Sequence, residues 1–259
     1  MPDQMAALRR GDEVNAVDLT RVAERPLLFS APMVLALLAR AKTQTRRILK
    51  LPPRLRHWAP CERPGYPSPD TTVDERGLHI EPLGKALDDP DNEDTYDVVP
   101  CPYGSPGDRL WVKETWRTEE FESDAEDLPA GTAGVRFAAD GAFLLIENTS
   151  EACEAWAIAH RKPSASNGRW RPSIFMSRWA SRLTLELLSV RVERLQSISE
   201  ADALAEGVDF CSAAKHLPPV DRYRLLWETI NGAGSWVANP WVWVVEFKQP
   251  AADAVNEAS

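Results

Sequence analysis

Residues 183–195 read LTLELLSVRVERL, and apolar and polar side chains alternate along most of this stretch. Alternation with a period of two predicts a β-strand that buries one of its faces. The stretch is too long to lie flat, so we expect a bend or a β-bulge, as in strands that curve into a barrel. A second run, WVWVVEF at 241–247, predicts another strand near the end of the chain.

Shorter signals predict the elements that precede this stretch. The sequence PLLF at 26–29 predicts a short strand. Ser30 and Pro32 then predict the start of a helix, because serine is a common N-cap and proline is tolerated in the first turn. We expect this helix to end near Arg40. The segment 42–47 is expected to be a loop or an irregular last turn.

A strand is expected at 109–116, after the turn residues at 106–108. Alternating residues at 135–139 and 142–146 flank an Asp-Gly pair, which is the usual signal for a β-hairpin. These segments add three strands to the predicted sheet structure.

Two helices are expected in the last quarter of the chain. Ser199 is predicted to cap the first, with Asp202 at the capping-box position and Gly207 at the end. The second is predicted at 221–230 from its amphipathic pattern. In that helix Arg222 and Arg224 are expected to be exposed, with the inward face formed by Tyr223, Leu226 and Trp227.

The order of the predicted elements indicates the fold class. Several strands with few helices between them, and no regular βαβ alternation, favour an α+β fold over a doubly wound sheet. We expect a mixed β-barrel decorated by short helices, formed by a single domain at 25–249. Long loop-rich insertions are expected at about 51–104 and 117–168, and flexible segments at 1–24 and 250–259.

The composition is that of a globular protein, with 44% hydrophobic and 27% charged residues in 259. No apolar run approaches the roughly 20 residues that a membrane-spanning helix needs, and the first residues do not resemble a signal peptide. These features predict a cytoplasmic protein that does not enter a membrane.

The cysteines give no clear metal or redox motif. Cys61, Cys101, Cys153 and Cys211 are widely spaced and contain no Cys-x-x-Cys pair, so reduced thiols are expected. His57 lies four residues before Cys61, and with Cys101 these residues leave a metal site open as an alternative. The expectation is that the protein holds no metal and no cofactor.

The net charge of −9 argues against a protein that coats nucleic acid through bulk electrostatics. Two windows nevertheless contain no acidic residue. The first lies between Glu24 and Glu62, and the second between Glu154 and Glu186. They hold these cations: Arg25, Arg40, Lys42, Arg46, Arg47, Lys50, Arg54 and Arg56 in the first, and Arg161, Lys162, Arg169, Arg171, Arg178 and Arg182 in the second. The windows are either two solvated faces or the walls of one groove for an anionic ligand.

Several of these features together resemble the ASCH-domain family of the PUA-like β-barrel superfamily. They are the first strand and helix, the motif Lys42-Thr43-x-Thr45-x-Arg47, a Gly-Asp turn before a strand, the helix from Ser199 to Glu206 and the final aromatic strand. The resemblance covers about 26–248 and is to the larger form that is frequent in phages and prophages. It implies a PUA-like barrel beside which a cleft binds RNA or modified nucleotides.

The same resemblance implies an activity. A small bacterial ASCH protein is an amidohydrolase that removes acyl groups from N4-acylcytidines with a lysine, a threonine and a glutamate. Matched residue by residue, these are Lys42, Thr45 and Glu206. This chain departs from the family at Arg40-Ala41, where Gly-Arg or Gly-Lys is frequent. It is also more than twice the size of the small enzymes.

The three residue types suit amide hydrolysis. Thr45 supplies a hydroxyl nucleophile, and Lys42 can act as its base if burial and the charges of Arg46 and Arg47 lower the lysine pKa. Glu206 can carry a proton to the leaving amine, while Thr43 and the two arginines are candidates for ligand binding. The alternative is that these cations are solvated loop residues, that Thr45 only caps a turn, and that Glu206 pairs with one of the cations.

Two tryptophans lie within the second acid-free window, next to arginines. Trp170 with Arg171, and Trp179 with Arg178, are candidates for stacking on a base. Packing against the barrel is the alternative for both aromatic rings.

Two functions therefore remain open from the sequence. One is an amidohydrolase that acts on N4-acylated cytosine nucleosides or related modified bases. The other is a non-catalytic module that binds RNA or a modified base. The expected partner is a modified nucleoside, a nucleotide or a single-stranded nucleic acid.

Overall fold

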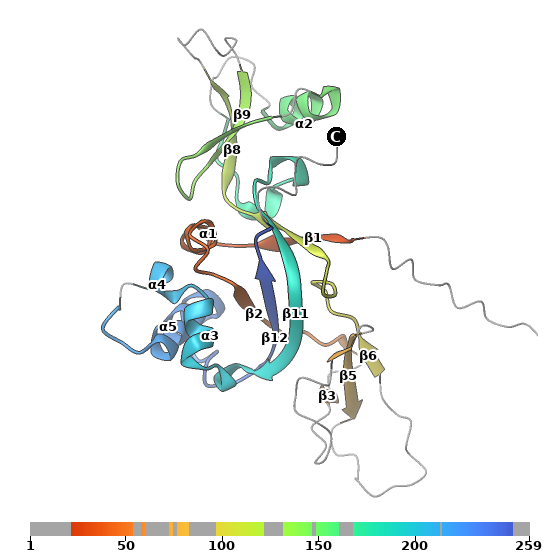
Figure 1. Cartoon of the computed structure of the whole chain (residues 1–259), viewed down its shortest axis with the longest axis vertical. Coiled ribbons are helices and arrows are strands. Elements are labelled where there is room, and N and C mark those ends of the chain that lie inside the picture. Colours follow the sequence, from red (N-terminus) through yellow and green to blue (C-terminus); the bar gives the residue numbers. More distant parts are fainter. Residues whose placement is uncertain are drawn as a thin grey trace, which may run out of the picture.

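The strand at the centre of the fold is β11 (Thr184–Arg194), which is visibly curved and lies in the middle of a five-stranded sheet (Figure 1). The strand order is β1 (Glu24–Leu28), β7 (Arg109–Lys113), β11, β12 (Trp241–Lys248) and β2 (Gln44–Ile48). β1 runs parallel to β7, and the other neighbours are antiparallel. The register between β11 and β12 shifts between Leu187 and Ser189, which confirms the predicted bulge.

The structure, a computed structural model, describes residues 22–53, 58–60, 73–74, 77–82, 97–121, 132–146, 149–160, 168–212 and 214–250. The segments 1–24 and 250–259, expected to be flexible, lie almost entirely outside these ranges. So do His57 and Cys61, and four cations of the acid-free windows: Arg54, Arg56, Arg161 and Lys162. Within the described ranges, no helix has both the length and the apolar character required to span a bilayer.

The predicted α+β class is confirmed, since sheets and short helices are mixed along the chain. The strand order ends at β1 on one side and at β2 on the other, so the described residues form an open sheet rather than a closed barrel. The two edge strands are nevertheless linked by a side chain. Arg47 Nη2 on β2 donates a hydrogen bond of 2.6 Å to the carbonyl oxygen of Leu28 on β1.

Strand β12 is buried on both faces because apolar residues occupy successive positions along it. Its alternate residues Trp243, Val245 and Phe247 pack into one core, which α1 (Ala31–Leu38) helps to form. Val242 and Val244 pack into a second core on the opposite face. That core is completed by residues of α3 (Glu200–Ala205), α4 (Val208–Cys211) and α5 (Pro219–Asn231).

A separate lobe contains β8 (Trp116–Phe121), β9 (Thr132–Phe137), β10 (Phe143–Leu145) and α2 (Ser150–His160), at the top of Figure 1. β9 and β10 confirm the predicted hairpin. Two 3₁₀ helices, at Ser173–Phe175 and Arg178–Ala180, follow the lobe in the chain, and a third lies at Leu195–Ser197. The lobe has its own core, in which Trp116 and Phe137 are almost fully buried. The described residues of the insertion expected at 117–168 therefore contain the predicted hairpin and a helix, and they contribute to this core.

The insertion expected at 51–104 also contains regular structure. A four-stranded sheet combines β3 (Trp58–Pro60), β4 (Val73–Asp74), β5 (Gly77–Pro82) and β6 (Asp97–Val99). Leu78 of this sheet is fully buried in the same core as α1 and β12. Leu78 therefore belongs to the core of the five-stranded sheet.

The single strand expected at 109–116 is divided, since β7 ends at Lys113 and β8 begins at Trp116 in another sheet. Two predictions about charged residues were also wrong. The segment expected to be a loop at 42–47 contains β2, whose residues pair with β12 in the register Arg46 to Val244. Arg222 was expected to be exposed, but only 6% of its surface is accessible and it forms an ion pair with Asp209. In both cases a distant part of the chain supplies the partner that allows a charged residue to be buried.

The helix signals near the site are confirmed. Ser199 and Asp202 form the capping box of α3. Gly207 follows with φ of +82°, a left-handed conformation that favours glycine. A Cβ atom at this position would lie 2.9 Å from Cβ of Ala36, so the turn after α3 packs directly against α1.

Candidate functional site

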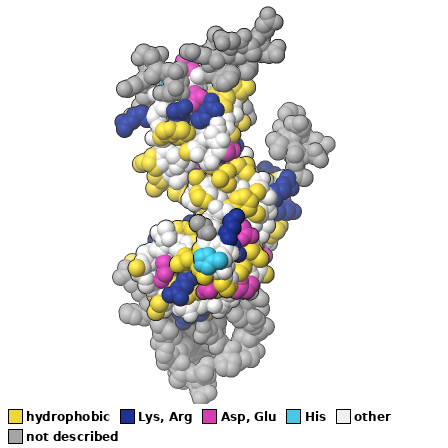
Figure 2. Space-filling view, turned by 90° about the vertical axis from the view of Figure 1, so that its left-hand side faces the viewer, with side chains coloured by type: hydrophobic (Ala, Val, Ile, Leu, Met, Phe, Trp, Pro, Cys, Tyr) yellow, Lys and Arg dark blue, Asp and Glu magenta, His cyan; other side chains and the backbone are white. Residues whose placement is uncertain are grey.

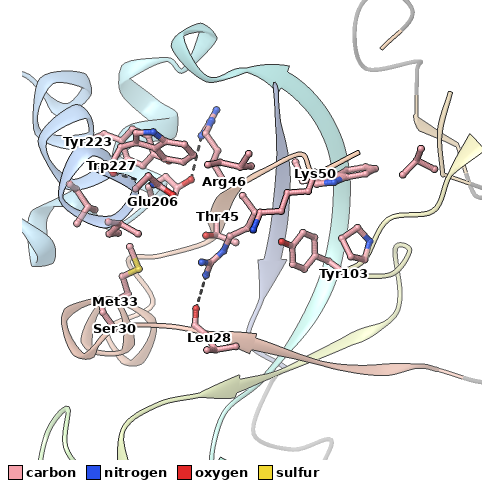
Figure 3. Close-up of a pocket in the computed structure, with 18 of the residues that line it drawn as sticks. Leu28, Ser30, Met33, Thr45, Arg46, Lys50, Tyr103, Glu206, Tyr223 and Trp227 are labelled. Carbon is pink, nitrogen blue, oxygen red and sulfur yellow. Dashed lines mark hydrogen bonds and ion pairs between the residues drawn. The ribbon is translucent and has the colours of Figure 1, made fainter. Parts of the chain in front are cut away.

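A pocket of about 730 Å³ opens between β1, β2 and α5 (Figure 3). Thr45, Arg46 and Arg47 of β2 line it, together with Glu206 at the end of α3. Aromatic side chains form much of the remaining wall: Tyr103, Tyr223, Trp227 and Trp243. The pocket therefore combines a few polar groups with aromatic surface, as sites for small organic ligands commonly do.

Lys42 and Glu206, 164 positions apart in the chain, form a buried ion pair. Lys42 Nζ donates hydrogen bonds of 2.8 Å to Glu206 Oε2 and to the Glu206 carbonyl oxygen. The side chains are only 0% and 2% exposed, respectively. Lys42 is placed by the turn after α1, where its amide donates to the carbonyl of Ala36, and Glu206 is the C-cap residue of α3.

Burial lowers the pKa of Lys42 below the ordinary value of a lysine, because the charged form loses its water. The carboxylate of Glu206 opposes this effect, both through its charge and through the hydrogen bond. Of the three groups that the resemblance assigns to one site, Lys42 and Glu206 are in contact, but Lys42 does not line the pocket and Thr45 has no hydrogen bond to either of them. The direction of the lysine pKa is the one that a general base requires.

Thr45 on β2 lines the same pocket as Glu206, although only 2% of the residue is accessible. Among the described residues, none forms a hydrogen bond with its hydroxyl, and neither Lys42 nor Glu206 contacts it in this way. Thr43 is exposed and does not line the pocket. Its backbone instead joins α3 to β12, because its amide donates to Ala205 and its carbonyl accepts from Phe247.

Arg46 belongs to a network of buried charges on the other face of β2. Its Nη2 lies 3.1 Å from Glu193 Oε2 and 3.2 Å from Asp202 Oδ2, and its Nη1 lies 3.6 Å from Glu206 Oε1. The arginine side chain is 0% exposed. Arg191 pairs with Glu193 and Asp202 in the same network. The charge of Arg46 is therefore largely compensated by the protein.

Some polar atoms near the pocket lack hydrogen bonds within the described part of the chain. They are Nε and Nη1 of Arg46, Nε of Arg47, Oε1 of Glu206 and Nε1 of Trp227, and all are inaccessible to solvent. Burial also raises the pKa of Tyr223 well above that of an ordinary tyrosine, with a further contribution from the charge of Glu206. Buried polar groups without partners are rare in proteins and concentrate where function or strain requires them.

The residues predicted from the second acid-free window lie elsewhere, and none of them lines the pocket. Trp170 is 47% exposed, with the Arg117 guanidinium 4.8 Å from its ring centroid. Trp179 packs edge-on against Trp116 in the core of the lobe, at 5.6 Å. Arg171 donates to the carbonyl of Ala159.

Two of the described cations of that window, Arg178 and Arg182, are paired with carboxylates that lie far away in the sequence. Arg178 contacts Glu24 at 2.7 Å, and Arg182 contacts both Glu114 and Asp140 at 2.9 and 2.8 Å. On the face shown in Figure 2, basic side chains occur in separate groups rather than in one continuous belt. The described cations of the two windows therefore do not gather around the pocket.

Sequence reasoning missed several residues of the pocket wall. Trp227 and Trp243 were interpreted only as core residues, and Tyr103 lies at the end of the first insertion, where no pattern singled it out. Lys50 was noted only as one cation of the first window. Its position a few residues after the Lys42–Arg47 motif is the one signal that could have drawn attention to it.

His57 and Cys61 of the metal alternative lie outside the described residues, and among the residues that the structure describes no group of three potential metal ligands occurs. Cys101 is partly buried, and burial raises the pKa of its thiol.

The fold and the site together define an α+β protein with a polar and aromatic pocket at the open edge of a curved sheet. Comparison with known proteins found no matching family model, no matching curated protein and no matching solved structure.

Proposed function

We propose that this chain is a PUA-like protein of the ASCH type that hydrolyses the amide of an N4-acylated cytosine nucleoside or a related acylated base. One observation supports this activity most strongly. A buried lysine–glutamate pair lies at the side of a pocket into which Thr45, three residues after Lys42, brings an unpaired hydroxyl. The family resemblance of Lys42, Thr45 and Glu206 supports the same assignment.

In the proposed reaction the Thr45 hydroxyl attacks the acyl carbon, and its proton passes to neutral Lys42, directly or through one water. The carbonyl becomes an oxyanion, which the newly charged lysine stabilises. Collapse of the oxyanion breaks the carbon–nitrogen bond, and the proton moves from Lys42 to the leaving amine. A water molecule then hydrolyses the threonine ester by the same proton transfers in reverse order. Glu206 keeps the lysine in position throughout.

The aromatic wall suits this substrate class. A pyrimidine base is flat and can stack on rings such as those of Tyr223 and Trp227, and stacking contributes about 1–3 kcal/mol per base in nucleic-acid-binding proteins. The wall also excludes water from the reacting amide, which strengthens electrostatic interactions there. In this proposal the aromatic side chains orient the base, and Thr45 and Lys42 carry out the hydrolysis.

The test is a turnover assay with N4-acetylcytidine, in which cytidine and acetate are both quantified. We expect release by the wild type and a loss of at least about a hundredfold in Thr45→Ala, because the nucleophile is absent. Thr229→Ala is the matched control, since Thr229 is an exposed threonine on α5 whose hydroxyl bonds only the carbonyl of Leu225. Equal activity in the Thr45 and Thr229 variants would remove Thr45 from the mechanism.

A second function, a non-catalytic module that binds RNA or a modified base, is favoured by one feature of the same site. Lys42 Nζ makes two hydrogen bonds to Glu206 and does not line the pocket. A lysine held in this way can have a purely structural role. If the wild type binds N4-acetylcytidine but forms no product, this second function replaces the first.

A further inference from the structure

The charged groups along the pocket wall do not balance one another. Three cations line it, Arg46, Arg47 and Lys50, and the only carboxylate among the described lining residues is Glu206. Glu206 is already paired with Lys42, while Arg46 is paired with Glu193 and Asp202. The remaining positive charge therefore belongs to Arg47 and Lys50.

Neither of these two cations forms an ion pair with any residue that the structure describes. Arg47 donates one hydrogen bond, to the carbonyl oxygen of Leu28, and its guanidinium lies 5.4 Å from the ring centroid of Phe29. Because a guanidinium has five N–H donors, most of its capacity is not used by this contact. Lys50 is exposed, and in Figure 3 its side chain extends over the pocket from the end of β2 toward Thr45 and Tyr103.

Tyr103 also lines the pocket, and its phenol interacts electrostatically with Arg47. Burial raises the pKa of its phenol, and the positive charge of Arg47 partly opposes that rise. The phenol therefore keeps its proton near neutral pH and can donate a hydrogen bond. One neutral donor and two uncompensated cations are thus present at one end of a pocket that has aromatic surface at the other.

A positive site in a protein of net charge −9 is selective for anions, since the surrounding acidic surface repels them everywhere else. Two cations match the charge of a phosphate monoester, which is close to −2 at neutral pH, better than that of a single phosphodiester. The pocket of about 730 Å³ also falls within the range of sites for single small molecules, roughly 300–1,000 Å³. Both features favour a free mononucleotide over a segment of polymer.

We propose that the pocket recognises a nucleoside 5′-monophosphate, with the phosphate held by Arg47 and Lys50 and assisted by the Tyr103 hydroxyl. This inference rests on the proposed function, because it specifies that the acylated substrate is a nucleoside monophosphate rather than a nucleoside. The base then lies against the Tyr223 and Trp227 side of the pocket, with its acylated amine toward Thr45.

Calorimetric titration of the full chain tests this assignment with three ligands: cytidine, cytidine 5′-monophosphate and a short oligocytidylate without terminal phosphates. We expect the monophosphate to bind at least about tenfold more tightly than cytidine, as charge-assisted hydrogen bonds to a phosphate contribute 1.4 kcal/mol or more. The preference should shrink as salt is added, because the site is open to solvent.

Lys50→Met is the decisive variant, since Lys50 is exposed and forms no hydrogen bond or ion pair with the residues that the structure describes. It should reduce the preference for the monophosphate over cytidine by about tenfold. Lys50→Arg should retain the preference. Lys215→Met is the matched control, because Lys215 is exposed, forms no ion pair with described residues and lies outside the pocket.

The possible outcomes separate this inference from the proposed function. Equal affinity for cytidine and its monophosphate, or an unchanged preference in Lys50→Met, would overturn the phosphate site even if N4-acetylcytidine is hydrolysed. Tighter binding of the oligocytidylate than of the monophosphate would also overturn it in favour of a polymer ligand. A strong preference for the monophosphate without hydrolysis of N4-acetylcytidine would support the phosphate site and contradict the proposed hydrolase activity.

Discussion

Replacing Glu206 by glutamine removes one negative charge from the buried pair with little change in shape. Lys42 is 0% exposed and cannot reach water to replace the lost carboxylate. Breaking a buried pair by removing one partner typically destabilises a protein by about 3–5 kcal/mol. Lys42 Nζ keeps its 2.8 Å hydrogen bond to the residue's carbonyl oxygen, and the new amide oxygen can accept a second. We therefore expect Glu206→Gln to lower the free energy of unfolding by about 3 kcal/mol at neutral pH, near the lower limit of that range.

The pH dependence of this loss gives a sharper test. Lys42 has a folded-state pKa below its ordinary value because it is buried, and Glu206 raises that pKa. In Glu206→Gln the folded-state pKa is therefore lower still. Between the folded and the unfolded pKa the unfolded chain binds more protons, so the free energy of unfolding rises with pH. The variant should approach the stability of the wild type as the pH is raised toward the ordinary pKa of lysine.

Urea denaturation at a series of pH values measures both effects, since the free energy of unfolding is obtained by linear extrapolation. Glu186→Gln is the control, because Glu186 pairs with Lys248 at 3.1 Å on the surface, with side-chain exposures of 37% and 53%. That change should cost no more than about 1 kcal/mol and should not recover with pH in the same way. A loss below about 1 kcal/mol in Glu206→Gln, or a difference that does not narrow at high pH, would refute a strongly coupled buried pair.

The remaining predictions concern stability and pH in three other places. Gly207→Ala should lower the free energy of unfolding by about 1–3 kcal/mol, since φ is +82° and the new Cβ would meet α1. Gly141 has φ of +71° and open space around it, so Gly141→Ala should lower the free energy of unfolding by less than Gly207→Ala does in the same denaturation assay. Arg182→Met leaves the carboxylate of Glu114 buried, and burial already raises the pKa of that group. Arg182→Met should lower the free energy of unfolding by about 3 kcal/mol at neutral pH. This difference from the wild type should diminish as the pH falls and Glu114 is protonated. A difference that grows in acid would contradict the prediction. If Lys42 is the base, kcat/KM for N4-acetylcytidine should rise with pH as Lys42 loses its proton, and Lys42→Met should abolish the rise; a flat wild-type profile would argue against this role.

The parts of the fold that could be predicted from sequence are those whose signals are local. The alternation within β11, its bulge and the Ser199 capping box depend on residues within a few positions of one another. β2 was missed because its charged residues resemble a loop in isolation. Arg46 becomes acceptable in a buried strand because carboxylates from distant parts of the chain lie near it, among them Glu193, 147 positions away.

The candidate site, too, could be predicted from the sequence only in part. The contact between Lys42 and Glu206 was expected from the family resemblance, and no periodicity in the chain indicates it. An absence of acidic residues in sequence did not predict a positive surface, because Arg178 and Arg182 find carboxylates on other elements. Tyr103 and Lys50 enter the pocket through the packing of the first insertion and of β2, which short-range patterns do not specify.

The central claim is that this pocket cleaves an acyl group from a modified cytosine. The most direct measurement is the number of cytidine and acetate molecules formed per molecule of purified full-length protein from N4-acetylcytidine. The proposed reaction predicts equal amounts of the two products and many turnovers, with both products lost in Thr45→Ala. Binding of N4-acetylcytidine without formation of either product would contradict it.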